Sequence, residues 1–79
     1  MSADSVQEVF IEILGLEEPI DWANVKYQET ERWDSLGHMA IVAELEDRFD
    51  VMLETDDILN MSSYERALEI LAKHGTSVS

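Results

Sequence analysis

The sequence predicts an all-α fold, a four-helix bundle with three longer helices, one short third helix and a long loop between the first two. Three segments place apolar residues at spacings of three and four, the period of a helix that buries one face. No stretch alternates apolar and polar residues as a half-buried strand does. The 79 residues hold neither repeats nor low-complexity segments, and this length suffices for one domain.

Charge restricts the partners that the chain can have. Eighteen acidic residues stand against five basic ones, a formal net charge of −13. We expect no nucleic acid partner, because such binding relies on lysine and arginine, and an anionic membrane surface would repel the chain. A protein with a basic patch would be attracted, most strongly at low salt. Solubility alone is the alternative explanation of the acidic composition.

The composition also bears on the compartment. There is no cysteine, which excludes a disulfide scaffold, a thiolate metal site and a cysteine nucleophile. No apolar run approaches the roughly 18 residues that cross a membrane. Residues 1–4 lack the basic flank and apolar stretch of a signal peptide. We therefore expect a soluble, cytoplasmic monomer.

The first helix is predicted over residues 4–14, with Ser2 or Asp4 as its cap and Gly15 as its stop. Residues 16–33 show no period, and Pro19 interrupts any helix there. We expect one short helical turn over 21–25. The face of the first helix consists of Val6, Val9, Phe10, Ile13 and Leu14, and the loop is expected to be held by Leu16, Ile20, Trp22, Val25, Tyr27 and Trp33.

The second helix is predicted to begin at Asp34 or Ser35 and to end at Asp50. Asp34 suits the N-cap, because its carboxylate can accept a backbone N–H of the first turn. A second apolar face, separate from the buried stripe, is either a docking surface or a contact with the long loop. The buried stripe is Ile41, Val42, Leu45 and Phe49, and the second face is Leu36, Met39, Ala40 and Ala43.

An extended connector over residues 51–53 leads to a short third helix over 55–60, which Thr55 is expected to cap. Ser62 and Glu65 form a capping-box pattern for the fourth helix. Gly75 ends that helix, so the domain occupies residues 1–75 and a flexible C-terminal tail occupies 76–79. The inner stripe of the fourth helix is Tyr64, Ala67, Leu68 and Leu71, with Ile70 beside it, and Lys73 and His74 complement its C-terminal dipole.

Ser35 lacks the surroundings of a hydrolytic nucleophile. Such a serine needs a base and an oxyanion hole. The Gly-x-Ser-x-Gly turn is absent, because Trp33 stands where its first glycine would be. His38 could touch Ser35, but we expect it to be a partly exposed helix residue near the loop. The acids from Glu44 to Asp57 lack the spacing of a calcium loop and predict a solvated face rather than a metal site.

The remaining chemistry for Ser35 is covalent attachment. A hydroxyl at a helix N-terminus meets backbone N–H groups and the positive end of the dipole, which favour an attached phosphodiester. Gly37 in the first turn either leaves room for such a group or is simply tolerated there.

Asp34-Ser35-Leu36 at the start of a helix resembles the attachment motif of acyl carrier proteins. The likeness continues in the acidic end of the second helix, in Asp56-Asp57-Ile58 and in Ser62-Ser63-Tyr64-Glu65-Arg66-Ala67, and it covers the chain from the first helix to Gly75. It implies a four-helix bundle of acyl-carrier-protein type, an acyl carrier domain over 1–75, and a protein that is not itself an enzyme.

The resemblance further implies that Ser35 carries a 4′-phosphopantetheine arm, transferred from coenzyme A by a phosphopantetheinyl transferase. The thiol of the arm would hold acyl groups as thioesters for acyl-loading, synthase and modifying enzymes with basic docking patches. Asp34 would cap the helix and orient the transferase. Between residues 44 and 57, seven acids face only Arg48. The partner-binding positions that the resemblance implies are Leu36, Met39, Ala43, Glu46 and Asp47.

The chain departs from the family pattern before the serine. Many members have glycine three residues earlier, where this chain has Arg32 followed by Trp33, so we expect an altered fit to the transferase or partner. Residues 33–38 resemble freestanding carriers of specialised, polyketide or related, biosynthesis. The alternatives are a housekeeping fatty-acid carrier and an acidic helical adaptor without a prosthetic group.

Overall fold

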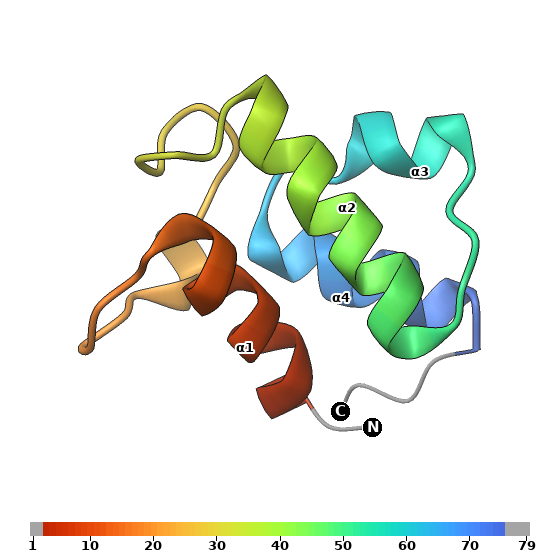
Figure 1. Cartoon of the computed structure of the whole chain (residues 1–79), viewed down its shortest axis with the longest axis horizontal. Helices are drawn as coiled ribbons and strands as arrows, with labels where there is room; N and C mark the ends of the chain where they lie inside the picture. The colour runs from red at the N-terminus through yellow and green to blue at the C-terminus, as the bar shows by residue number, and fades with distance from the viewer. Residues whose placement is uncertain (1–2, 76–79) are drawn as a thin grey trace.

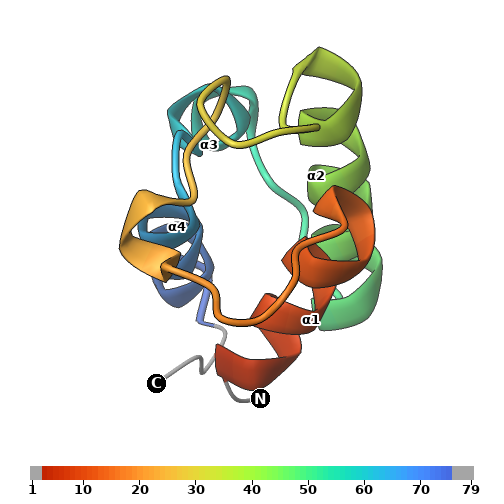
Figure 2. The ribbon, with the colours of Figure 1, turned by 90° about the vertical axis from the view of Figure 1, so that its left-hand side faces the viewer.

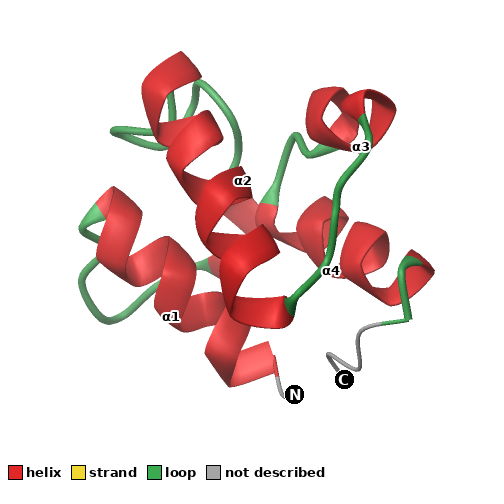
Figure 3. Cartoon of the chain, turned by 45° about the vertical axis from the view of Figure 1, so that its right-hand side comes forward, coloured by secondary structure: helices red, strands yellow, loops and turns green. Residues whose placement is uncertain are grey.

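The computed structural model of the chain describes residues 3–75, and over this range the fold is all-α, as predicted. It contains four α-helices and, among the described residues, no β-strand (Figure 3). None of these helices combines the length and the apolar character that a membrane crossing requires. Ser2 and the predicted tail 76–79 lie outside the described residues. The elements are α1 (Ala3–Leu14), the 3-10 turn η1 (Trp22–Asn24), α2 (Ser35–Phe49), α3 (Thr55–Asn60) and α4 (Tyr64–Lys73).

The core lies between α1, α2 and α4, which turn their apolar faces toward one interior (Figure 1). The predicted stripes of α1 and α2 are confirmed, although Ile13 is only half-buried. In α4, Ile70 is buried and Leu68 is half-buried against the core, the reverse of the prediction, so the buried stripe lies toward Ile70. The buried side chains are Val6, Val9, Phe10 and Leu14 of α1, Ile41, Val42, Leu45 and Phe49 of α2, and Tyr64, Ala67, Ile70 and Leu71 of α4.

Gly15 ends α1, as predicted. Its backbone has a φ of +66°, a left-handed conformation that glycine adopts without a steric penalty. Its N–H donates to the carbonyl of Ile11 at 2.9 Å, which closes the last turn. The chain then leaves the helix and enters the long loop.

The long loop is held against the helices, as predicted. Trp22, within η1, packs against Tyr64 of α4 with ring centroids 4.5 Å apart. Figure 2 shows η1 lying beside α4. Val25 is buried, and the predicted helical turn over 21–25 is confirmed as η1. The other predicted loop anchors are half-buried against the core: Leu16, Ile20 and Tyr27.

The loop also pairs with the backbone that precedes α4. The N–H of Tyr27 donates to the carbonyl of Ser62 at 3.0 Å, and the N–H of Tyr64 donates to Val25 at 2.9 Å. These bonds frame an isolated antiparallel bridge between Lys26 and Ser63. The chain around residue 63 is therefore extended, and α4 can begin only after it.

This pairing corrects the predicted start of α4. Ser63, not Ser62, is the N-cap, and its Oγ accepts the N–H of Arg66 at 3.1 Å. With Ser63 as the N-cap, Arg66 occupies the third helical position, and Glu65 stands one position too early to complete a capping box.

The end of α2 follows the prediction. Asp50 is the C-cap, with a left-handed φ of +53°, and its N–H donates to the carbonyl of Glu46. Residues 51–53 form the extended connector. Leu53 is buried in the core, whereas the side chain of Met52 is 83% exposed.

The start of α3 differs from the prediction in two ways. Glu54 rather than Thr55 is the N-cap, and its N–H donates to Asp57 Oδ2 at 3.3 Å. Asp57 is 3% exposed, so it is not part of a solvated acidic face. Its carboxylate accepts hydrogen bonds from Lys73 Nζ and, at 2.6 Å, from His74 Nε2. The bond from Lys73, followed by that from His74, lowers the pKa of Asp57 to about 2.

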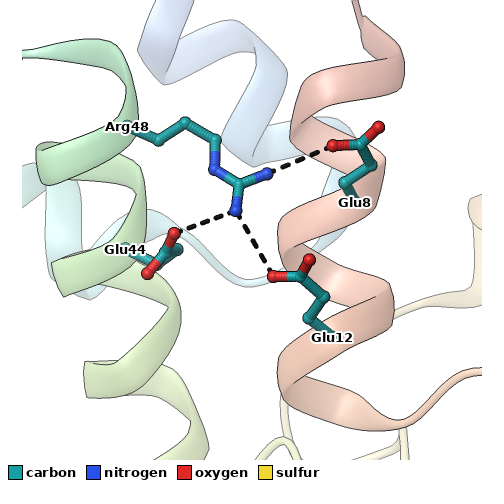
Figure 4. Close-up of polar contacts among 4 residues, drawn as sticks. All are labelled: Glu8, Glu12, Glu44 and Arg48. Carbon is teal, nitrogen blue, oxygen red and sulfur yellow. Dashed lines mark hydrogen bonds and ion pairs between the residues drawn. The ribbon is translucent and has the colours of Figure 1, made fainter.

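Arg48 joins α2 to α1 through a cluster of carboxylates (Figure 4). Its guanidinium lies 3.3 Å from Glu8, 3.3 Å from Glu12 and 3.0 Å from Glu44. The hydrogen bond to Glu44 is the largest cause of a raised pKa of Arg48. The one basic residue of segment 44–57 is thus turned toward α1 and paired with Glu8, Glu12 and Glu44.

Candidate functional site

Ser35 is the first residue of α2, and its side chain is exposed. Asp34 is the N-cap, as predicted, because its Oδ1 accepts the N–H of Gly37 at 3.0 Å. The N–H of His38 donates to the backbone carbonyl of Asp34 at 2.7 Å. The helix therefore starts in a fixed register, with the serine hydroxyl on its first turn.

Tyr27 is the neighbour of the serine hydroxyl. Its phenol oxygen lies 3.4 Å from Ser35 Oγ. The ring of Tyr27 also packs edge-on against the imidazole of His38, with centroids 5.0 Å apart. Sequence reasoning treated Tyr27 only as a loop anchor, because nothing local relates it to a serine eight residues later.

His38 is half-buried, as predicted, but both of its ring nitrogens have partners. Trp33 Nε1–H donates to His38 Nδ1 at 2.9 Å, and His38 Nε2 lies 2.7 Å from the carbonyl oxygen of Ile58. Because Nδ1 must accept from the indole, Nε2 carries the proton and donates to Ile58. His38 thus has no lone pair available to activate Ser35.

Trp33 is 1% exposed and packs against Phe10 with ring centroids 5.2 Å apart. Its role as a loop anchor is confirmed. The expectation that its bulk alters the fit of a partner is wrong, because the indole points into the core. Arg32 is exposed, so the same expectation remains a prediction for that residue alone.

Arg32 and Gly37 are related through their backbones. Arg32 has a φ of +72°, a left-handed conformation that favours glycine. Its carbonyl oxygen lies 2.1 Å from where a Cβ on residue 37 would stand. This close approach requires glycine at position 37. The sequence had suggested two other reasons, room for an attached group and simple tolerance of glycine in the first turn.

The second apolar face of α2 is exposed, so it is not covered by the long loop. Leu36 is 84% exposed and Met39 54%. Ala40 and Ala43 are also exposed on this helix. Contact with the loop, one of the two interpretations of this face, is therefore wrong.

The two acids expected at a docking surface differ in their surroundings. Asp47 is exposed. Glu46 is half-buried, and its carboxylate accepts the N–H of Leu53 at 2.9 Å, which holds the connector after α2. Sequence reasoning missed this second role, because it depends on a residue seven positions away in an irregular segment.

A small recess lies next to this turn, between the loop and α3. Its volume is about 150 Å³, and Tyr27 and His38 form the wall nearest Ser35. Residues of α3 and of the chain after it complete the lining. The remaining lining residues are Ile58, Leu59, Met61 and Ser62.

Comparison with known proteins identified no matching family model, no similar curated protein and no similar solved structure. The site is therefore characterised by its own geometry. That geometry is an exposed serine hydroxyl on a capped helix start, beside a phenol, a histidine with both ring nitrogens hydrogen-bonded and an exposed apolar face.

Proposed function

We propose that this chain is an acyl carrier protein, with a bundle of that type, and that Ser35 carries a 4′-phosphopantetheine arm. The observation that supports this most is the exposed Ser35 hydroxyl on the first residue of α2, directly after the capping Asp34. Since His38 cannot act as its base, Ser35 is better suited to accept a group from another enzyme than to start chemistry itself.

The residues around Ser35 fit an attached phosphodiester. The N-terminus of α2 carries a partial positive charge that favours an anion. Tyr27 Oη, 3.4 Å from Ser35 Oγ, can donate a hydrogen bond to a phosphate oxygen attached there. Gly37 adds no side chain to the first turn. When bound, the arm supplies a terminal thiol for thioesters, a group absent from this cysteine-free chain.

In the modification, Ser35 Oγ forms the new P–O bond to the phosphopantetheine phosphorus, and the adenosine bisphosphate part of coenzyme A leaves. The proton of the serine must pass to a base of the transferase, because His38 has both nitrogens engaged. Asp34 keeps Ser35 at the helix start through its bond to Gly37, which is the role that the resemblance assigns to this acid.

The exposed face of α2 suits the docking of enzymes with basic patches. Leu36, Met39 and Ala43 offer apolar contact, and Asp47 adds an exposed negative charge at the far end of the same helix. Glu46 adds charge there as well, while also holding Leu53. We infer weak, salt-dependent contacts with the transferase and with acyl-loading, synthase and modifying enzymes. The tether raises the effective concentration of its cargo at each of them.

The pathway rests on resemblance alone. The sequence Trp33-Asp34-Ser35-Leu36-Gly37-His38 supports specialised biosynthesis, and a housekeeping fatty-acid carrier is the alternative. An acidic adaptor without a prosthetic group would also use the exposed face of α2, but it gives no reason for the placement of Ser35.

Incubation with coenzyme A and a broad-specificity phosphopantetheinyl transferase tests the proposal. We expect intact-protein mass spectrometry to show one added phosphopantetheine on the wild type and none on Ser35→Ala. Ser62→Ala is the matched control, since Ser62 is also an exposed serine just before a helix, and it should be modified like the wild type. An unmodified wild type favours the adaptor, and a modified Ser35→Ala places the arm elsewhere.

A further inference from the structure

Arg32 differs from the other basic residues of the chain in its charge environment. Three of the five basic residues are held in ion pairs with acids: Arg48, Arg66 and Lys73. Lys26 is half-buried. Arg32 is exposed, and none of the ion pairs within residues 3–75 includes it. An uncompensated positive charge therefore lies on the surface of a strongly acidic chain.

The guanidinium of Arg32 lies over Gly15, at the end of α1. Its Nη1 is 3.0 Å, and its Cζ 3.5 Å, from where a Cβ on Gly15 would stand. Both residues are exposed, so this contact leaves the charge accessible to a partner.

The loop that carries Arg32 is closed at its base, beside the serine. It projects next to the start of α2 (Figure 1). The N–H of Gln28 donates to the carbonyl of Trp33 at 2.8 Å, which closes the loop. Tyr27, directly before this closure, has its phenol oxygen 3.4 Å from Ser35 Oγ. The backbone of Arg32 is therefore held in a defined place near the serine.

An enzyme that modifies Ser35 has Arg32 within its reach. It must bring a base to the Ser35 hydroxyl, because both ring nitrogens of His38 are engaged. A standard interface covers about 800 Å² on each partner, a patch of roughly 16 Å radius. Three residues of extended chain span at most about 11 Å, and the Arg32 carbonyl oxygen contacts the first turn of α2 at Gly37. Arg32 thus falls inside such a patch when the patch is centred near Ser35.

The charge of Arg32 is opposite to that of the acids on α2. Glu46 and Asp47 attract a basic patch on an enzyme, whereas a basic group placed opposite Arg32 is repelled. A carboxylate placed there would instead pair with the guanidinium. Arg32 can therefore distinguish two kinds of enzyme that the acids of α2 alone would attract equally.

We propose that Arg32 is a specificity-determining residue for the enzyme that modifies Ser35. It disfavours an enzyme surface that is basic throughout and favours one with a carboxylate opposite Arg32. This inference rests on the proposed function of Ser35. It gives Arg32 no part in the transfer itself, so a change at Arg32 should alter KM for the chain and leave kcat as it is.

Phosphopantetheinylation by a broad-specificity transferase with a basic docking surface tests the proposal. Arg32→Glu should raise kcat/KM about threefold at low salt, the order expected for a change of two unit charges about 10 Å from a basic group in water. The gain should fade at high salt. Arg66→Glu is the matched control, because Arg66 is an exposed arginine on α4 and the variant has the same net charge. It should change kcat/KM much less, and Arg32→Lys should match the wild type.

Equal kcat/KM values for Arg32→Glu and Arg66→Glu would overturn the proposal. A lower value for Arg32→Glu would also overturn it, because the group opposite Arg32 would then be an anion, such as a phosphate of coenzyme A. A change in kcat alone would place Arg32 in the transfer step and contradict the assignment. Should Arg32→Glu fail to fold, Arg32→Gln removes one charge and should give about a twofold gain.

The same assay separates the two proposals. A wild type that is modified, with equal values for the two glutamate variants, rejects the role of Arg32 and keeps the function of Ser35. A wild type that is never modified rejects the function of Ser35 and the role of Arg32 with it.

Discussion

The carbonyl oxygen of Arg32 approaches the α-carbon of Gly37 so closely that a Cβ there would stand 2.1 Å from it. The contact joins the end of the long loop to the first turn of α2. The loop and the serine-bearing turn are therefore in direct backbone contact.

Gly37→Ala should lower the free energy of unfolding by about 1–3 kcal/mol, the usual cost of overpacking. Urea denaturation measures it. The sign of the change in unfolding free energy tests the contact with Arg32. Without that contact, a glycine-to-alanine change inside a helix would stabilise the protein by about 0.5–1 kcal/mol. A more stable Gly37→Ala would show that the loop does not press on the helix.

Arg32→Gly should raise the free energy of unfolding by about 0.5–1 kcal/mol. Relief of the left-handed backbone gains about 1–2 kcal/mol, and the greater freedom of glycine in the unfolded chain offsets part of it. The same denaturation experiment on Arg32→Ala is the control, because alanine removes the side chain and keeps the φ of +72°. Equal stability of the two variants would contradict the prediction.

Asp57→Asn should change how stability depends on pH. The folded pKa of about 2 lies below the ordinary value of 3.8, so the unfolded chain binds more protons between these values. Stabilisation by Asp57 is thus present above about pH 4 and lost as the pH falls toward 2. The gap in unfolding free energy between wild type and Asp57→Asn should shrink over that window. Asp56 is an exposed neighbour of Asp57 and serves as the control. The difference in unfolding free energy between wild type and Asp56→Asn should not change with pH over the same window.

Asp47→Lys should lower kcat/KM of phosphopantetheinylation several-fold at low salt, and the effect should fade at high salt. Stability should change by less than about 0.5 kcal/mol, because Asp47 is exposed. Glu46→Gln is the companion variant, since it removes a charge and keeps an acceptor for the N–H of Leu53. Unchanged kinetics for both variants at low salt would remove α2 as the docking helix.

Local patterns were enough to predict the helices and the start of α2. The apolar period located α1 and α2 to within one residue, and the capping chemistry of Asp34 was evident from its place before Ser35. The start of α4 was missed by one residue because Ser62 and Ser63 are equally good caps. The choice between them depends on pairing with Val25 and Tyr27, which is remote in sequence.

The contacts missed at the site are also those between distant residues. In the sequence, Asp57 has the pattern of an ordinary acid in the first turn of a helix. In the folded chain, Lys73 and His74 at the end of α4 bind its carboxylate. In the sequence, His38 has the pattern of a partly exposed helix residue. In the folded chain, its ring nitrogens contact the Trp33 indole of the loop and the Ile58 carbonyl of α3. Such partners follow from the packing of helices, which periodicity alone does not specify.

The central claim is that Ser35 anchors a phosphopantetheine arm, and the mass of the protein recovered from cells that natively produce it tests this most directly. We predict the polypeptide mass plus one phosphopantetheine, with or without an acyl group, and a modified peptide that contains Ser35. Recovery at the bare polypeptide mass alone, from cells with an active transferase, would contradict the account.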